Sequence, residues 1–252
     1  MTLDELHVHV LPDEQALARA AADHAIGVLR AAIAGHGRAN VMFASGNSQL
    51  AFLDALAASD RVDYSKVAAF HMDEYIGMGA DHPAGFARYM LERVDERLHP
   101  RTFHFLRGDT PDPAAEAVRY ASLLRDHPLD LCCLGIGENG HLAFNDPPVA
   151  DFDDPTDVKV VELDEACRRQ QVGEGHFPTL ADVPTHAITV TIPALLRAGT
   201  VLAIVPEARK AEAVKRALTG PIETASPASA LRRCAHATLY LDADSASGLG
   251  TP

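Results

Sequence analysis

The amino-acid sequence predicts a single α/β domain, 1–252, with helices on both faces of a mainly parallel sheet. Short apolar runs that are typical of buried strands alternate along the chain with helical patterns, and the links between them are short. No linker or repeat divides the 252 residues, of which 47% are hydrophobic, so one ordinary core is expected. The predicted architecture is therefore three-layered and Rossmann-like.

The individual elements follow from hydrophobic periodicity and from residues that begin or end helices. Leu6 to Leu11 alternates as a half-buried strand does, and Pro12-Asp13 then opens an alanine-rich helix that Gly35 and Gly37 close. The same signals predict strands at 6–11, 40–44, 66–72, 102–106, 129–134, 158–163, 185–192, 201–205 and 237–241. They predict helices at 14–34, 49–58, 82–98, 113–125, 164–172 and 207–218, with short helices that begin at 193 and 226.

Charge and cysteine content exclude several classes of protein. The formal net charge of −13 and a pI near 5.4 make the chain a poor counterion for a polyanion, so we expect no nucleic-acid partner. The four cysteines form no disulfide framework, and Cys132 and Cys133 should point to opposite faces of a buried strand. With no leader and no apolar run that could span a bilayer, we expect a cytoplasmic protein that has no membrane partner.

The most informative stretch is the glycine-rich loop from Gly135 to Pro148, which follows the apolar strand 129–134. Ligands bind at the carboxyl ends of strands in open α/β sheets. A loop there that carries one histidine among amides and carboxylates indicates a catalytic loop, and the alternative is a plain connection with an incidental histidine. Its polar residues are Glu138, Asn139, His141, Asn145 and Asp146.

A second candidate is the junction between the strand 40–44 and the next helix. Glycine and small hydroxylated residues let the backbone approach a ligand, and the helix that follows offers free N–H groups to a phosphate. The alternative is that Asn47 or Ser48 caps the helix. The candidate phosphate-binding residues are Ser45, Gly46, Asn47 and Ser48.

Two further positions carry charges that need a reason. Asp73 and Glu74 follow a buried strand, where desolvation raises a carboxyl pKa toward the range of a general base; alternatively they cap the next loop. Arg209 and Lys210 fall early in a predicted helix, against its dipole, which indicates an anion or, equally, a solvated face. A sugar phosphate that loses a proton next to a carbonyl group would use all of these sites together.

Two motifs resemble a known family. They are Phe-His-Met-Asp-Glu-Tyr75 with the downstream His82-Pro83, and Gly135-Ile-Gly-Glu-Asn-Gly-His-Leu-Ala-Phe-Asn-Asp-Pro147. Over roughly 40–242 the chain resembles the glucosamine-6-phosphate deaminase/isomerase family, which shares its fold with 6-phosphogluconolactonases, and the Ala-Phe-Asn-acid-Pro portion favours the deaminase branch.

The resemblance implies an enzyme that needs no metal or redox cofactor. Such an enzyme converts an aminosugar 6-phosphate to a ketose 6-phosphate plus ammonia by aldose–ketose isomerisation and deamination. The alternatives are a lactonase-type hydrolase on the same scaffold and a sugar-phosphate-binding protein without turnover. The identity of the aminosugar and the presence of a homo-oligomer stay open.

The resemblance also implies roles for the catalytic residues. Asp73 matches the base that carries a proton between C2 and C1, with Glu74 as its neighbour, and His141 matches the residue that assists ring opening. Asp146 stands where the family usually has a glutamate that orients this histidine. Asn139 stands where the family usually has an aspartate, and an amide fixes orientation without supplying a charge.

For the phosphate, the resemblance assigns the loop 45–48 and Lys210. A second arginine that the family places after the helix at 164–172 has no clean counterpart in this sequence. Arg169 or His176 is the expected replacement.

Overall fold

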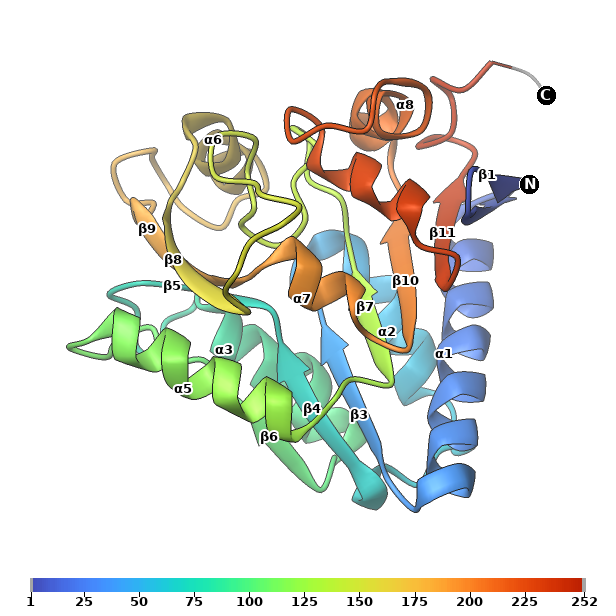
Figure 1. Cartoon of the computed structure of the whole chain (residues 1–252), viewed down its shortest axis with the longest axis horizontal. Coiled ribbons are helices and arrows are strands. Elements are labelled where there is room, and N and C mark those ends of the chain that lie inside the picture. Colours follow the sequence, from blue (N-terminus) through green and yellow to red (C-terminus); the bar gives the residue numbers. More distant parts are fainter. Residues whose placement is uncertain (1, 251–252) are drawn as a thin grey trace.

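The computed structural model describes residues 2–250, which form a large, mainly parallel sheet and a small antiparallel one (Figure 1). The strands are β1 Thr2–Leu3, β2 Leu6–Leu11, β3 Ala39–Phe43, β4 Val67–His71, β5 Asp73–Tyr75, β6 Thr102–His104, β7 Leu131–Leu134, β8 Val158–Glu162, β9 His186–Val190, β10 Thr200–Val205 and β11 Ala237–Asp242. The α-helices are α1 Glu14–His36, α2 Leu50–Ala57, α3 Phe86–Met90, α4 Glu96–Leu98, α5 Pro113–Asp126, α6 Glu165–Gly173, α7 Ile192–Leu196 and α8 Ala211–Thr219. Tighter 3₁₀ turns are η1 Asn47–Gln49, η2 Tyr64–Lys66, η4 Ala208–Lys210 and η5 Pro227–Arg233, and η3 Leu91–Asp95 is a π-helical segment.

The large sheet reverses its strand order at one point. Its order is β1-β2-β11-β10-β7-β3-β4-β6, and every neighbouring pair is parallel except β1 with β2. From β3 the chain adds β4 and β6 on one side, and then returns to place β7 and β10 on the other. The carboxyl ends of β3 and β7 therefore flank the switch point at which a doubly wound sheet binds its ligand.

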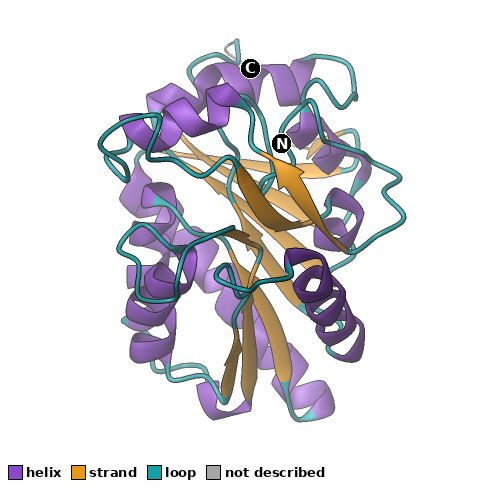
Figure 2. Cartoon of the chain, turned by 90° about the vertical axis from the view of Figure 1, so that its left-hand side faces the viewer, coloured by secondary structure: helices purple, strands orange, loops and turns teal. Residues whose placement is uncertain are grey.

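Helices cover both faces of this sheet, which confirms the predicted three-layer architecture (Figure 2). One core joins the sheet to α1, α2 and the α3–α4 segment, and the other joins it to α5, α7 and α8. Cys132 lies in one core and the adjacent Cys133 in the other, as the alternation of a buried strand requires.

The small sheet, with the order β5-β9-β8, was not predicted as a separate unit. The predicted strands at 158–163 and 185–192 form β8 and β9 and pair with each other, and β9 pairs in addition with Asp73–Tyr75, which the sequence does not predict as a strand. Only Met72 separates β4 from β5, so the chain passes straight from one sheet into the other. Because side chains alternate along a strand, Asp73 and Glu74 must point to opposite sides.

Three predicted helices need correction at their beginnings. The helix predicted from His82 begins at Phe86, because Gly85 is extended at the N-cap and the Glu74 carboxylate accepts the first N–H groups. The helix predicted from Glu207 begins with η4, so Arg209 and Lys210 precede α8. The helix predicted from Ser226 is the 3₁₀ turn η5.

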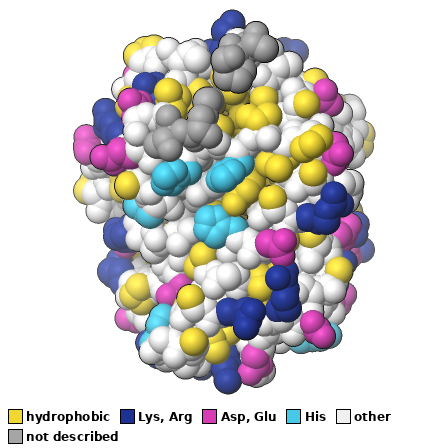
Figure 3. Space-filling model, turned by 90° about the vertical axis from the view of Figure 1, so that its right-hand side faces the viewer, with side chains coloured by type: hydrophobic (Ala, Val, Ile, Leu, Met, Phe, Trp, Pro, Cys, Tyr) yellow, Lys and Arg dark blue, Asp and Glu magenta, His cyan; other side chains and the backbone are white. Residues whose placement is uncertain are grey.

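Histidine side chains gather on the face formed by α1, β2 and β11 (Figure 3). His9 stacks on Tyr240 with ring centroids 5.3 Å apart, and His24 Nδ1 lies 2.9 Å from the Tyr240 hydroxyl. These contacts explain the strand histidine at position 9 without a ligand. In residues 2–250, none of the helices has the length and apolar character needed to cross a membrane.

Candidate functional site

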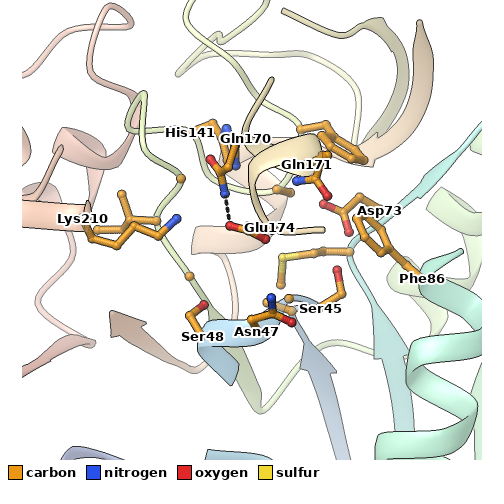
Figure 4. Close-up of a pocket in the computed structure, with 18 residues that line it drawn as sticks. Ser45, Asn47, Ser48, Asp73, Phe86, His141, Gln170, Gln171, Glu174 and Lys210 are labelled. Carbon is orange, nitrogen blue, oxygen red and sulfur yellow. Dashed lines mark hydrogen bonds between the residues drawn. The ribbon is translucent and has the colours of Figure 1, made fainter. Parts of the chain in front are cut away.

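A polar pocket opens at the switch point, above the carboxyl ends of β10, β7, β3 and β4, which are neighbours in the sheet. Figure 4 shows the side chains that converge on it from these strand ends and from α6. The polar side chains that line it belong to Ser45, Asn47, Ser48, Asp73, His141, Gln170, Gln171, Glu174 and Lys210. Four segments that are separate candidates in the sequence thus meet in one place.

The loop 45–48 forms the wall next to β3 and is fixed from several sides. Gly46 has φ +111°, which an L-residue rarely adopts, and its carbonyl accepts a hydrogen bond of 2.8 Å from the Tyr89 hydroxyl. Gln49 Nε2 donates to the Ile204 carbonyl at 3.1 Å. The side chains of Asn47 and Ser48 cap neither η1 nor α2, so the alternative that they serve as helix caps is wrong.

Tyr89→Phe should lower the free energy of unfolding by about 1 kcal/mol, because the Gly46 carbonyl loses its donor. Tyr64→Phe is the matched control, since the Tyr64 hydroxyl is buried and has no hydrogen-bond partner among residues 2–250, so that its removal should cost nothing. Urea titration of the two variants checks this. Equal losses would contradict a specific role of Tyr89 in holding the loop.

Lys210 also lines the pocket, where η4 follows β10. The residue is only 3% exposed, and Figure 4 shows the amine directed into the pocket. Within residues 2–250 its ammonium makes neither an ion pair nor a hydrogen bond, and burial lowers the pKa of Lys210 while Glu174 partly restores it. A buried cation without a direct partner is a site for an anion.

Asp73 and Glu74, predicted as a pair, divide between two roles. The Asp73 carboxylate faces the pocket, is 6% exposed and accepts no hydrogen bond from the described part of the chain. Burial, followed by repulsion from Glu74 and Asp146, raises the pKa of Asp73 well above its usual range. That is the state of a carboxylate that can take a proton at neutral pH.

Glu74 points away from the pocket and holds the chain together. Its carboxylate accepts N–H groups from Tyr75 at 2.8 Å, Phe86 at 3.1 Å and Ala87 at 2.6 Å. Burial raises the pKa of Glu74 to about 7, although the hydrogen bonds from these three N–H groups lower it. The alternative interpretation, in which the carboxylate serves as a cap for the next segment of chain, is therefore correct for Glu74.

His141 lies against the backbone of Gly137, where an added Cβ would come within 2.3 Å of the imidazole ring. Its Nδ1 is 2.9 Å from Asp146 Oδ1. Asn139 supports this arrangement, because its Nδ2 donates to Asp146 Oδ1 at 2.9 Å and its Oδ1 accepts the backbone N–H of His141 at 3.0 Å. Burial alone would raise the pKa of Asp146, but the contacts from His141 and Asn139 outweigh it and lower that pKa.

The predicted partners of His141 are thus in place, although only the histidine lines the pocket. Asn145 anchors the same loop by donating to the carbonyls of Leu142 and Val190, both at 2.8 Å. Cys167 of α6 lies beside the pair, and the ligand atoms of His141, Asp146 and Cys167 are within 4.8 Å of one another. A metal ion there would displace contacts that Asp146 already makes.

The prediction that Arg169 contacts the phosphate is wrong, because the side chain lies outside the pocket. Its side chain is 69% exposed, is bonded to Glu165 one turn earlier in α6 and does not line the pocket. His176 is turned instead toward Glu174, with Nε2 3.3 Å from Oε2. No arginine therefore takes the place of the missing one among the residues that line the pocket.

Gln170, Gln171 and Glu174 contribute the wall where the sequence predicts a cation. Helical spacing could have found them, because the buried Cys167 and Gln171 mark the inward face of α6 and Glu174 lies three residues beyond Gln171. The family resemblance implies a positive charge in this segment. The charged residue of the segment that lines the pocket is instead the carboxylate of Glu174.

Comparisons with known proteins agree with this geometry. A family described as glucosamine-6-phosphate isomerases/6-phosphogluconolactonase matches residues 12–240. A glucosamine-6-phosphate deaminase of an Exiguobacterium species is 39% identical over 188 residues, covering 75% of this chain and 72% of the relative. A second, from Exiguobacterium sibiricum, is 37% identical over 206 residues, covering 81% and 79%.

Solved structures extend the likeness to the whole fold. A monomeric glucosamine-6-phosphate deaminase superposes with a TM-score of 0.87 at 27% identity, covering 96% of this chain and 99% of the other. A 6-phosphogluconolactonase from Shewanella baltica superposes with a TM-score of 0.78 at 19% identity, covering 96% and 100%, and shows the shared fold alone. The chain belongs to the family of glucosamine-6-phosphate isomerases and 6-phosphogluconolactonases.

Proposed function

We propose that this chain is a deaminating isomerase that converts an aminosugar 6-phosphate, of the glucosamine-6-phosphate type, to a ketose 6-phosphate and ammonia. The observation that carries the proposal is the convergence of Asp73, His141 and Lys210 on one pocket at the switch point. Relatives of 34% to 39% identity bear the name glucosamine-6-phosphate deaminase, which supports the same reaction.

Each group has a place in the proposed sequence. The phosphate lies between Lys210 and the loop 45–48, which leaves the sugar ring across the pocket toward Asp73. His141, held by Asp146, transfers the proton of the C1 hydroxyl to the ring oxygen, so that the bond between C1 and the ring oxygen breaks and C1 becomes an aldehyde. Asp73 takes the C2 proton and delivers it to C1, so that the amine becomes a C2 iminium, and water then releases ammonia to leave the ketone.

The test is an ammonia-release assay over glucosamine, galactosamine and mannosamine 6-phosphates, with product analysis for the ketose. Stoichiometric ammonia and ketose phosphate from at least one sugar is the expected result. Acid release from a sugar lactone phosphate without any ammonia would assign the chain to the hydrolase branch. Saturable binding of sugar phosphates without product would make it a binding protein.

Asn139→Asp tests how the histidine's partner is held. The new carboxylate would stand 2.9 Å from Asp146 Oδ1 in place of a donor, so near pH 8 the free energy of unfolding should fall by about 1–3 kcal/mol. The repulsion raises the folded-state pKa of the new carboxyl above its unfolded value. The loss of unfolding free energy in Asn139→Asp therefore grows as pH rises and shrinks as pH falls, because the protonated carboxyl can donate to Asp146 again.

Asn139→Ser is the matched control, since it removes the donor to Asp146 without adding a charge. Denaturant titrations of both variants at pH 5 and pH 8 measure the difference. If Asn139→Asp loses the same unfolding free energy at pH 5 as at pH 8, Asn139 does not act as a donor to Asp146.

We also propose that the chain acts in the cytoplasm on a small-molecule substrate. Cys132, Cys133, Cys167 and Cys234 are all buried as free thiols, which suits a reducing compartment.

A further inference from the structure

The end of the pocket that is lined by Lys210 and the loop 45–48 also contains a carboxylate, which would repel a bound anion. Glu174 lines the pocket, its side chain is 6% exposed, and Figure 4 shows it facing the same space as Lys210, Asn47 and Ser48. It approaches the space that the proposed phosphate would fill.

The contacts of Glu174 keep it charged and in place. Its Oε1 accepts from Gln170 Nε2 at 2.8 Å and lies 3.1 Å from Arg209 Nη1, while its Oε2 lies 3.3 Å from His176 Nε2. Burial alone would raise the pKa of Glu174, but the bonds from His176 and Gln170 and the charges of Lys210 and Arg209 outweigh it and lower that pKa to about 2. Glu174 is therefore an anion at neutral pH.

The neighbouring Arg209 offsets the negative charge of Glu174 only in part. Arg209 is shared among carboxylates, because Glu207, Glu174 and Glu138 all lie within 3.7 Å of its guanidinium nitrogens. It does not line the pocket. A bound anion would therefore meet Lys210 as its one described cationic neighbour in the lining, and Glu174 as a competing negative charge.

We propose that Glu174 is a binding-site residue that weakens the hold of this pocket on the phosphorylated end of its substrate. The inference rests on the phosphate site of the proposed function. A carboxylate fixed beside Lys210 offsets much of the attraction that the ammonium supplies, and both groups are buried, so solvent screens the repulsion little. Removing the charge of Glu174, with its shape kept, should leave Lys210 free to attract the phosphate.

The experiment measures the binding of inorganic phosphate by calorimetry at constant ionic strength, which needs no turnover. Glu174→Gln should bind phosphate roughly tenfold more tightly than the parent protein, and Glu174→Ser, which also removes the charge, should shift affinity in the same direction. Glu165→Gln is the matched control on the same helix. Glu165 is exposed and bonded to Arg169 outside the pocket, so phosphate affinity should not change.

Thermal unfolding establishes that the variants are folded. Unchanged or weaker phosphate binding by folded Glu174→Gln and Glu174→Ser would overturn the proposal, as would an equal gain in Glu165→Gln. If the reaction proposed above also holds, Glu174→Gln lowers KM for the aminosugar phosphate. Tighter phosphate binding without ammonia release from any variant would support the role of Glu174 and reject the deaminase function, so the two failures are distinguishable.

Discussion

Asp73→Asn should lower the rate of ammonia release by about 10²–10⁴-fold and at the same time leave the protein as stable as before or more stable. The catalytic loss is expected because an amide cannot carry the C2 proton. The gain in stability is expected because the Asp73 carboxylate accepts no hydrogen bond from the described residues and is repelled by Glu74 and Asp146. A substitution that damages the fold would reduce both properties together.

The pH dependence gives the same prediction a second measurement. Because the folded-state pKa of Asp73 is raised, the folded protein binds the proton more tightly than the unfolded chain, and this contribution to stability is lost as pH rises through the folded pKa. The extra stability of Asp73→Asn should therefore be small near pH 4 and grow toward pH 8. Thermal unfolding at both values measures it.

Turnover should follow the same titration in the parent protein. Since Asp73 must be ionised to accept the C2 proton, the acid limb of kcat/KM should lie above the range of an ordinary carboxylate. Near-parental turnover of Asp73→Asn would remove Asp73 from the reaction. If the acid limb of kcat/KM lies at the same pH in the parent protein and in Asp73→Asn, Asp73 is likewise not the proton carrier.

The contrast between Asp73 and Glu74 shows where sequence reasoning ends. Both follow an apolar strand and both are buried, so local pattern alone predicts one role for the two of them. Their roles separate because the chain enters β5, whose partner β9 lies more than a hundred residues later, and because N–H groups of Phe86 and Ala87 bond Glu74. Neither cause is local in the sequence.

The large sheet, by contrast, could be predicted almost strand by strand. Its central strands are continuous buried runs, such as the one that ends at Leu134, and their carboxyl ends carry the loops that meet at the pocket. The small sheet and the inward face of α6 could not, because their polarity is mixed. The sequence pattern therefore does not single out Glu174, and the family resemblance leads to Arg169 or His176 instead.

His141→Gln should lower the rate of ammonia release by about 10²–10³-fold, for a reason that differs from that of Asp73→Asn. A glutamine can still contact Asp146 but cannot hold a proton for the ring oxygen. The fold should survive, since the His141 side chain is 12% exposed and makes its polar contact with Asp146 alone among the described residues.

Exchange in D₂O separates the two roles. Ketose 6-phosphate supplied with ammonia has an open-chain form of its own, so exchange at C1 needs the proton carrier and does not need assisted ring opening. Asp73→Asn should abolish this exchange, while His141→Gln should retain much of it despite its low rate of ammonia release. Equal loss of exchange in the two variants would contradict the assignment of ring opening to His141, and full ammonia release by His141→Gln would remove the histidine from the reaction. The two roles can therefore be measured separately: His141 handles the proton at the ring oxygen, and Asp73 carries the proton between C2 and C1.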